Sequence, residues 1–261
     1  MSNLYVVATP IGNLEDITLR ALRIMREVNL IAAEDTRKTR RLLAAYEIKT
    51  PMTSYHEHNK LTKLDYILNC LENGDVALVS SAGMPGISDP GYELIIAAHQ
   101  RNIPVVPVPG ASAVMTALAV SGLPTDRFIY LGFLPGKGAE RRRRLESVAG
   151  ETGTVIAFEA PHRLKAALND MLLVLGDREV AVCRELTKIH EEVFRGTVSQ
   201  AVARFTEPRG EFTLVIAGEQ ERGKPELTEE VERQLQERRQ SGAAAKEAVT
   251  QIAKATGLSK K

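Results

Sequence analysis

The stretch that decides the fold is VALVSSAGMPGISDPG, residues 76–91. Residues 76–79 are apolar with a valine at each end, which is typical of a short buried strand. The glycines and prolines that follow leave little room for regular structure, so the strand must end in a tight loop. In an open α/β sheet, ligands bind just beyond the carboxyl ends of the strands, where glycine lets the backbone approach them. The stretch therefore predicts a ligand-binding loop, and a turn-rich connection that binds nothing is the alternative.

The composition indicates a folded protein without a strong overall charge. The chain has 261 residues, 44% of them hydrophobic, which is enough for one large or two ordinary domains. Its 34 Lys and Arg nearly balance 33 Asp and Glu, so any binding of nucleic acid must come from local patches. Two cysteines, Cys70 and Cys183, are too few for a disulfide framework. The chain leads directly into a strand, and no run reaches about 18 apolar residues, so we expect a cytoplasmic protein that spans no membrane.

Strand-like and helix-like segments alternate along the chain. A strand at residues 4–8, an amphipathic helix and a second strand, LIAAE, give the β-α-β order of a parallel sheet. After the turn GLPTDR at 122–127 the alternation starts again. We therefore expect an α/β fold with one α/β domain at residues 1–122 and a second at 123–220.

Two polar residues are placed to begin helices. We call residues 76–91 the organising stretch, and the part after its strand the organising loop. Asp89 can cap the helix after this loop, with Pro90 in its first turn. Ser112 can cap a helix over 112–121 and present backbone N–H groups to a ligand, although a pure cap would need no ligand.

Residues 221–261 differ from the rest of the chain. They are polar and charged, and they end in an alanine-rich segment followed by TGLS. This ending resembles the first helix and turn of a helix-turn-helix, which needs a further helix to complete its core. We expect a helical tail that is truncated and poorly ordered.

Two basic runs are candidate RNA contacts. One lies in a predicted helix after LIAAE, and the other follows the segment LPGKG, where four consecutive arginines cannot all face a core. Exposed Lys and Arg bind phosphates with salt-dependent affinity, whereas a solvated helix face is the alternative for both runs. The candidates are Arg37, Lys38, Arg40, Arg41, Lys137, Arg141, Arg142, Arg143 and Arg144.

Several common kinds of site are disfavoured. His56 and His58 flank Glu57, but their spacing suits no single helix face and no third ligand is nearby, so we expect no metal. The turn TPIGN at 9–13 lacks GxGxxG, which disfavours a nicotinamide or flavin cofactor. The sequence also lacks GxSxG and GxxxxGKS/T, so it has no nucleophile or nucleotide-phosphate signature.

Six motifs occur in order between residues 3 and 218. They are TPIGNLEDIT, AAEDTR, the organising stretch, VPVPGASA, DRFIYLGFLP and CRELTK. This set resembles the RsmI family of small-subunit (16S) ribosomal RNA cytidine-2′-O-methyltransferases, within the tetrapyrrole-methylase superfamily. The resemblance implies two α/β domains of tetrapyrrole-methylase type with the cofactor cleft between them, and S-adenosylmethionine as cofactor. It also implies ribosomal RNA or the assembled small subunit as substrate, and a homodimer.

The resemblance also implies cofactor contacts at matching positions. These are Pro10, Ser81, Ala82, Gly83, Met84, Ser112, Ala113, Phe158 and Ala217. The organising loop departs from the usual family pattern SDAGTP, because Ser81 and Met84 replace an acid and a threonine. A neutral hydrogen bond is weaker than a charged one, so Ser81 should bind a cationic cofactor about tenfold more weakly than an acid.

Methyl transfer from a sulfonium needs positioning more than a metal or a covalent intermediate. The acceptor hydroxyl is weakly acidic, so a base or a water must take its proton. The candidate bases are Glu34, Asp35, His56, Glu159 and His162, each of which has a salt bridge or a helix cap as its alternative role. A small-molecule methylase acting on a tetrapyrrole would share the fold but leave the basic runs without a purpose. A non-enzymatic RNA-binding module would use those runs without a cofactor.

Overall fold

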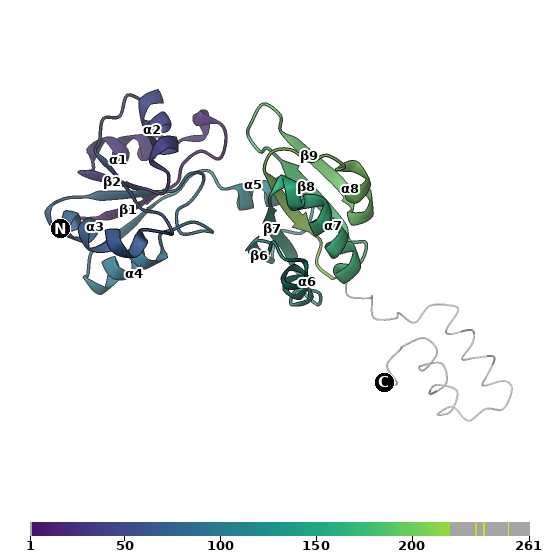
Figure 1. The fold of residues 1–261 in the computed structure, drawn as a ribbon. Coiled ribbons are helices and arrows are strands. Elements are labelled where there is room, and N and C mark those ends of the chain that lie inside the picture. Colours follow the sequence, from purple (N-terminus) through teal and green to yellow (C-terminus); the bar gives the residue numbers. More distant parts are fainter. Residues whose placement is uncertain (1, 220–232, 234–236, 238–249, 251–261) are drawn as a thin grey trace. The chain divides into compact units, whose positions relative to one another are not determined.

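The computed structural model describes residues 2–219, 233, 237 and 250. The chain up to Gly218 forms one compact unit that contains two five-stranded sheets (Figure 1). No helix in these described residues is both long enough and apolar enough to cross a membrane. The helix-turn-helix predicted within 221–261 falls almost entirely outside the described residues.

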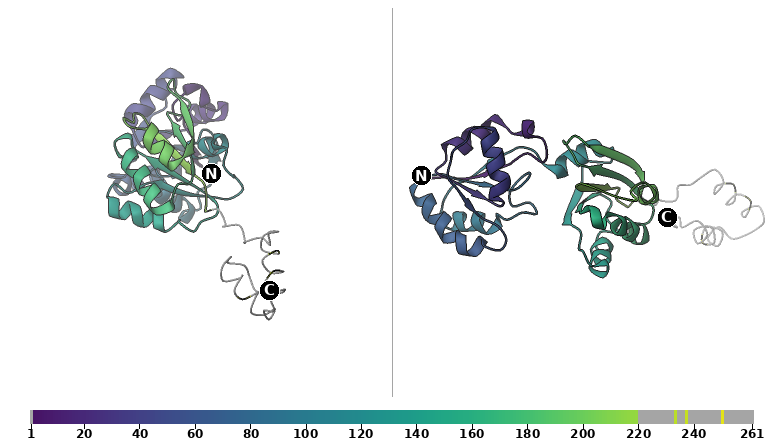
Figure 2. Two further views of the ribbon diagram at one scale, coloured as in Figure 1. Left: turned by 90° about the vertical axis from the view of Figure 1, so that its right-hand side faces the viewer. Right: turned by 45° about the horizontal axis from the view of Figure 1, so that its top comes forward.

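The first sheet is parallel throughout, as the β-α-β order predicts, and has the strand order β3-β2-β4-β1-β5. Its strands are β1 (Leu4–Val7), β2 (Leu30–Ala33), β3 (Met52–Ser54), β4 (Val76–Val79) and β5 (Val105–Val108). Strands β2 and β4 are buried along their whole length because helices cover both faces of the sheet. One pair, α1 (Leu19–Glu27) and α2 (Thr36–Ala45), packs on one face. The other pair, α3 (Lys60–Asn73) and α4 (Tyr92–Gln100), packs on the opposite face (Figure 2).

The second sheet is mixed and has the order β6-β7-β10-β8-β9, in which only β6 and β7 are parallel neighbours. Its strands are β6 (Phe128–Phe133), β7 (Thr154–Glu159), β8 (Glu179–Arg184), β9 (Glu192–Thr197) and β10 (Phe212–Ile216). The helices α6 (Gly138–Glu146), α7 (Pro161–Leu175) and α8 (Val198–Arg204) pack on one face of this sheet.

The other face of the second sheet is covered by α5 (Ala113–Ser121), which precedes the sheet in sequence. Val114, Ala117 and Leu118 of this helix pack with apolar residues of β7, β8 and β10. The boundary predicted at residue 122 groups α5 with the first sheet, whereas its packing joins it to the second. The sequence did not indicate on which sheet α5 packs, because this helix is apolar on most of its surface and has no polar face that would distinguish the two sheets. The division into two separate domains stays a prediction.

Candidate active site

The loop after β4 is held tightly against the end of β1. The N–H group of Thr9 donates to the Gly83 carbonyl and the N–H of Gly83 donates to the Thr9 carbonyl, both at 2.9 Å. The Thr9 hydroxyl donates to the Ser80 carbonyl at 3.2 Å. Gly83 has a φ of 78°, which side-chain-bearing residues rarely adopt. The loop is therefore fixed at the carboxyl edge of the sheet, the position expected of a ligand-binding loop.

A cavity of about 480 Å³ opens beside this loop. Its volume lies in the range typical of small-molecule sites. The cavity wall includes the loop after β4, the start of α5 and the end of β7. Seven predicted cofactor positions line it, namely Ser81, Ala82, Gly83, Met84, Ser112, Ala113 and Phe158. The structure thus brings together positions that lie up to 77 residues apart in the sequence, 158 minus 81.

Two of the predicted cofactor positions do not line the cavity. Pro10 does not line the cavity, whereas the next residue, Ile11, does. Ala217 follows the carboxyl end of β10, which runs antiparallel to β7, so only the amino end of β10 reaches the cavity through Phe212 and Thr213. We therefore remove Ala217 from the proposed cofactor contacts, because strand direction places it at the opposite end of the sheet.

One wall of the cavity is aromatic. The ring of Phe158 lies 5.2 Å from that of Tyr130 and 5.4 Å from that of Phe133, both in edge-to-face contacts. Nearby, Ser112 caps α5 by accepting the Met115 N–H, which confirms its predicted capping role. An aromatic wall beside a helix N-terminus offers a planar surface and N–H donors to a heterocyclic ligand.

Acidic groups also line the cavity. The Oε2 atom of Glu34, at the end of β2, accepts the Ser81 N–H at 2.8 Å. Asp89 lines the same cavity. Burial raises the pKa of Asp89 to about 6, the nearby charge of Glu34 adds to the rise, and the Ser80 hydroxyl and Lys38 oppose it.

The prediction that Asp89 caps the next helix is wrong. Helix α4 begins two residues later than expected, its N-cap is Gly91, and no side-chain hydrogen bond caps its first turn. Ser88 has a φ of 62° and its hydroxyl shares a hydrogen bond of 2.7 Å with Tyr130 Oη. This turn directs the loop so that Asp89 enters the cavity wall instead. An Asp-Pro pair before an apolar segment is typical of a helix N-cap. Only the position of Asp89 in a predicted ligand-binding loop could have indicated that it lines a cavity.

A second cavity of about 460 Å³ shares part of this acidic lining. Glu34, Ser88 and Asp89 line both cavities. The second cavity is otherwise lined by His56, Glu57, His58 and Pro90. The two imidazole rings lie 6.0 Å apart at an interplanar angle of 65°, and the Nδ1 atom of His56 has no hydrogen-bond partner in the described part of the chain. No set of three His, Cys, Asp or Glu side chains suited to a metal occurs among the described residues.

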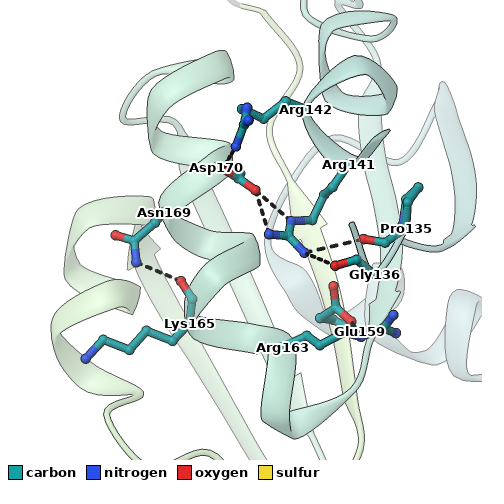
Figure 3. Close-up of polar contacts among 9 residues, drawn as sticks. All are labelled: Pro135, Gly136, Arg141, Arg142, Glu159, Arg163, Lys165, Asn169 and Asp170. Atoms are coloured by element: carbon teal, nitrogen blue, oxygen red, sulfur yellow. Dashed lines mark hydrogen bonds and ion pairs between the residues drawn. The ribbon is translucent and has the colours of Figure 1, made fainter. Parts of the chain in front are cut away.

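The other candidate bases have structural roles. Asp35 caps α2 by accepting the N–H groups of Arg37 and Lys38, and these bonds hold its pKa below the usual value. Glu159 is fully buried and pairs with Arg163 Nε at 2.9 Å (Figure 3). Burial raises the pKa of Glu159, although the N–H of Ala160 and the charge of Arg163 oppose the rise.

Glu159 belongs to the cavity wall by its place at the end of β7. Its side chain lies with the residues of α6 and α7, on the face of the sheet away from α5 (Figure 3). His162 is exposed on α7 and lines neither cavity. Of the five candidates, Glu34 and His56 therefore keep access to a cavity with their side chains.

A family model for Tetrapyrrole (Corrin/Porphyrin) Methylases matches residues 3–202. The chain belongs to this family. It is a methyltransferase that uses S-adenosylmethionine, as the sequence predicted, so the reading as a non-enzymatic module is wrong.

The chain is 53% identical to "Ribosomal RNA small subunit methyltransferase I" of Halalkalibacterium halodurans, over 85% of this chain and 78% of the relative. It is 49% identical to the protein of the same name from Synechocystis, over 99% of this chain and 94% of the relative. The predicted family resemblance is confirmed. The solved uroporphyrin-III-C-methyltransferase from Thermus thermophilus matches with a TM-score of 0.58 and 19% identity, over 83% of this chain and 94% of that one. This likeness confirms the fold.

In this tetrapyrrole methylase, the second basic run divides into a buried and an exposed part. Arg141 is 5% exposed, and its Nε and Nη2 atoms bind Asp170 Oδ2 at 2.8 and 2.7 Å (Figure 3). Its Nη1 atom donates to the carbonyls of Pro135 and Gly136. Arg142 binds the other oxygen of Asp170 at 3.1 Å. We therefore remove Arg141 from the proposed RNA contacts, because its donors are used inside the protein.

The remaining basic residues stay available at the surface. Arg37, Lys38, Arg40 and Arg41 are exposed on α2, and Lys38 also lines the larger cavity. Arg143 and Arg144 are exposed on α6, while Lys137 precedes that helix and is 82% exposed at its side chain. The first basic run is thus the one that lies at a cavity.

Proposed function

We propose that the chain methylates the 2′-hydroxyl of a cytidine ribose in small-subunit ribosomal RNA, with S-adenosylmethionine as donor. The observation that carries the proposal is the 49–53% identity to relatives named ribosomal RNA small subunit methyltransferase I, over most of both chains. The fold alone would suit many methyl acceptors, since a uroporphyrin methylase shares it. The exposed Arg and Lys residues of α2, beside the cavity that Lys38 lines, favour a polyanionic acceptor.

We assign the larger cavity to the cofactor. The cofactor supplies an electrophilic methyl group on a positively charged sulfur. The aromatic wall around Phe158 suits its adenine, and the N-terminus of α5 offers N–H donors. Glu34 and Asp89 add negative charge to the lining, which suits the cationic end of the molecule.

The proposal extends to the RNA contacts, assembly and location of the protein. Phosphate contacts are assigned to the basic residues of the two runs other than the buried Arg141, which are Arg37, Lys38, Arg40, Arg41, Lys137, Arg142, Arg143 and Arg144. Of these, Arg142 is half-buried and also pairs with Asp170. We also propose a homodimer that acts in the cytoplasm, on ribosomal RNA or on the assembled small subunit. The phosphate contacts rest on the exposure of the two basic runs, and the homodimer follows from the family resemblance.

The test offers competing acceptors to the purified protein. Tritiated S-adenosylmethionine is supplied with small-subunit RNA, with assembled small subunits, or with a uroporphyrinoid, all from sources that lack this methylation. We expect label on a cytidine ribose, recognised because the 2′-O-methyl group protects the adjacent phosphodiester from alkaline cleavage. Label on a base, or only on the porphyrinoid, would overturn the proposal. A gel-filtration run of the same preparation tests the homodimer.

A further inference from the structure

The two cavities meet at a wall of three residues. Glu34, Ser88 and Asp89 line both the larger cavity, assigned to the cofactor, and the second cavity beside it. Methyl transfer needs the acceptor oxygen, the methyl carbon and the sulfur in line and close together. With the donor in one cavity and the acceptor in the other, the transferred methyl group has to lie at this shared wall. The group that takes the acceptor's proton must lie there too.

The two carboxylates in the shared wall are not equivalent. Glu34 Oε2 already accepts the Ser81 N–H at 2.8 Å, so this oxygen is engaged in holding the loop after β4. No backbone N–H in the described part of the chain donates to Asp89. A hydrogen bond with the Ser80 side chain acts to lower the pKa of Asp89. Ser88 is engaged with Tyr130, so its hydroxyl is a poor acceptor for a further proton.

We propose that Asp89 is the proton acceptor of the methyl-transfer reaction and that the acceptor ribose enters through the second cavity. This inference rests on the proposed function. The ribose O2′ attacks the methyl carbon, the carbon–sulfur bond breaks, and its electron pair returns to sulfur to give a neutral thioether. The proton leaves O2′ for a carboxylate oxygen of Asp89. The negative charge of Glu34 raises the pKa of Asp89 and so favours the proton on Asp89.

The surroundings of Asp89 fit this role at neutral pH. Its pKa of about 6 leaves it ionised and able to accept a proton near pH 7, yet more basic than an exposed aspartate. The charged and titratable groups that face it come from the end of β2, from α2, from the loop after β3 and from β6. They are Glu34, Lys38, His56, Glu57, His58 and Tyr130. Lys38 is the cation among the causes of the shift, and it acts against the effect of Glu34.

The second cavity has the chemistry of a nucleoside site. Bases turned out of an RNA strand commonly stack on aromatic or histidine rings. His56 and His58 supply two such rings, and the unpartnered Nδ1 of His56 is a polar atom that a ligand can satisfy. Glu57 lines the same cavity and can accept N–H groups such as the amino group of cytosine.

The experiment compares the rate of ribose methylation in single turnover, with saturating S-adenosylmethionine, for wild type, Asp89→Asn and Asp89→Glu. We expect Asp89→Asn to be at least about 100-fold slower, since general-base catalysis contributes about 100- to 10,000-fold. The wild-type rate should rise about tenfold per pH unit below pH 6 and level off above it. Asp89→Asn should lose this pH dependence, and Asp89→Glu should keep it with a partly restored rate.

Three controls separate the role of Asp89 from other effects. Asp65→Asn removes an exposed carboxylate of α3, 86% exposed at its side chain, and should leave the rate unchanged. Calorimetric titration of S-adenosylmethionine measures how far Asp89→Asn weakens cofactor binding, so that the rate of each variant is compared at its own saturation. A rate for Asp89→Asn within threefold of wild type, or a rate loss removed by more cofactor, would overturn the inference. Absence of ribose label with the wild type would instead reject the proposed function.

Discussion

Two loops of this protein have similar local sequences and opposite outcomes. The loop at residues 80–91 follows β4, and the loop at 134–137 follows β6; both contain Gly and Pro and both lead to a helix. In the first, Asp89, which looks like a helix cap, lies in the wall of two cavities. In α6, the helix to which the second loop leads, Arg141 looks like a surface cation but is buried against Asp170. A charged residue next to a turn therefore has a role that depends on partners from distant parts of the chain.

The difference has an energetic basis. A buried charge is stable only with a partner and enough hydrogen bonds. Arg141 has both, because Asp170 of α7 and two loop carbonyls use its donors (Figure 3). Asp89 has no such cation in direct contact among the described residues, and its raised pKa records the unfavourable environment. The pairing of Arg141 with Asp170 stabilises the fold. Asp89 lowers the stability of the folded protein, but at a position where its raised pKa is useful for catalysis.

The largest effect is expected on breaking the buried ion pair. Arg141→Ala leaves Asp170 buried with only the more exposed Arg142 as partner, so the free energy of unfolding should fall by about 3–5 kcal/mol. Urea unfolding followed by circular dichroism measures this change. The matched control, Arg144→Ala, removes an exposed arginine of the same helix and should change stability by less than about 0.5 kcal/mol. Equal losses for the two variants would mean that burial does not distinguish the two arginines.

The local sequence predicted the strands and helices better than it predicted the long-range contacts of individual residues. The apolar run Val76–Val79 gave a correct strand because both faces of a covered parallel strand are apolar, and Ser112 caps its helix as a short polar residue should. The errors concern residues whose roles come from long-range contacts. Arg141 meets a residue 29 positions away, Ala217 is displaced by the direction of its strand, and α5 packs on the sheet that follows it. None of these contacts can be predicted from hydrophobic periodicity or from the residues next to them in sequence.

A smaller effect is expected on neutralising Asp89. Its carboxyl has a higher pKa in the folded state, about 6, than the usual 3.8, so the folded protein binds the proton more tightly than the unfolded chain. Stability is therefore greatest below about pH 4 for this group and falls as pH rises towards 6. Asp89→Asn should remove this pH dependence and raise the free energy of unfolding at pH 7 by about 1–3 kcal/mol. Urea unfolding at pH 4.5 and 7 tests this, and an unchanged difference between the two pH values would contradict it.

The next effect is a change in RNA binding, expected from the exposed arginines of the second basic run. Replacing Arg143 and Arg144 by Ala should weaken RNA binding and reduce the log-log salt slope by roughly one unit per lost phosphate contact. Affinity for S-adenosylmethionine should not change, because neither residue lines the cofactor cavity. The comparison variant replaces Arg37 and Arg40, which are exposed on α2 close to Lys38. If neither pair alters the salt slope measured by fluorescence anisotropy, both runs are solvated helix faces.

The smallest effect is expected at Ser81, which stands where the pattern SDAGTP has an acid. Ser81 lines the cofactor cavity and its N–H is bound to Glu34, so an aspartate there would add a third carboxylate to the wall that contains Glu34 and Asp89. Charged hydrogen bonds exceed neutral ones by roughly 1 kcal/mol, so Ser81→Asp should strengthen binding of S-adenosylmethionine by up to about tenfold. S-adenosylhomocysteine lacks the sulfonium charge and should gain less.

Calorimetry on both ligands separates two explanations for the serine. A larger gain for S-adenosylmethionine would mean that position 81 faces the cationic end of the cofactor and that Glu34 and Asp89 supply only part of the needed charge. Equal or weaker binding by Ser81→Asp would mean that these two carboxylates already fill that role. In that case, repulsion among three acids raises the pKa of each and cancels the added attraction. Ser81→Asn, similar in size and uncharged, distinguishes the charge from the added volume.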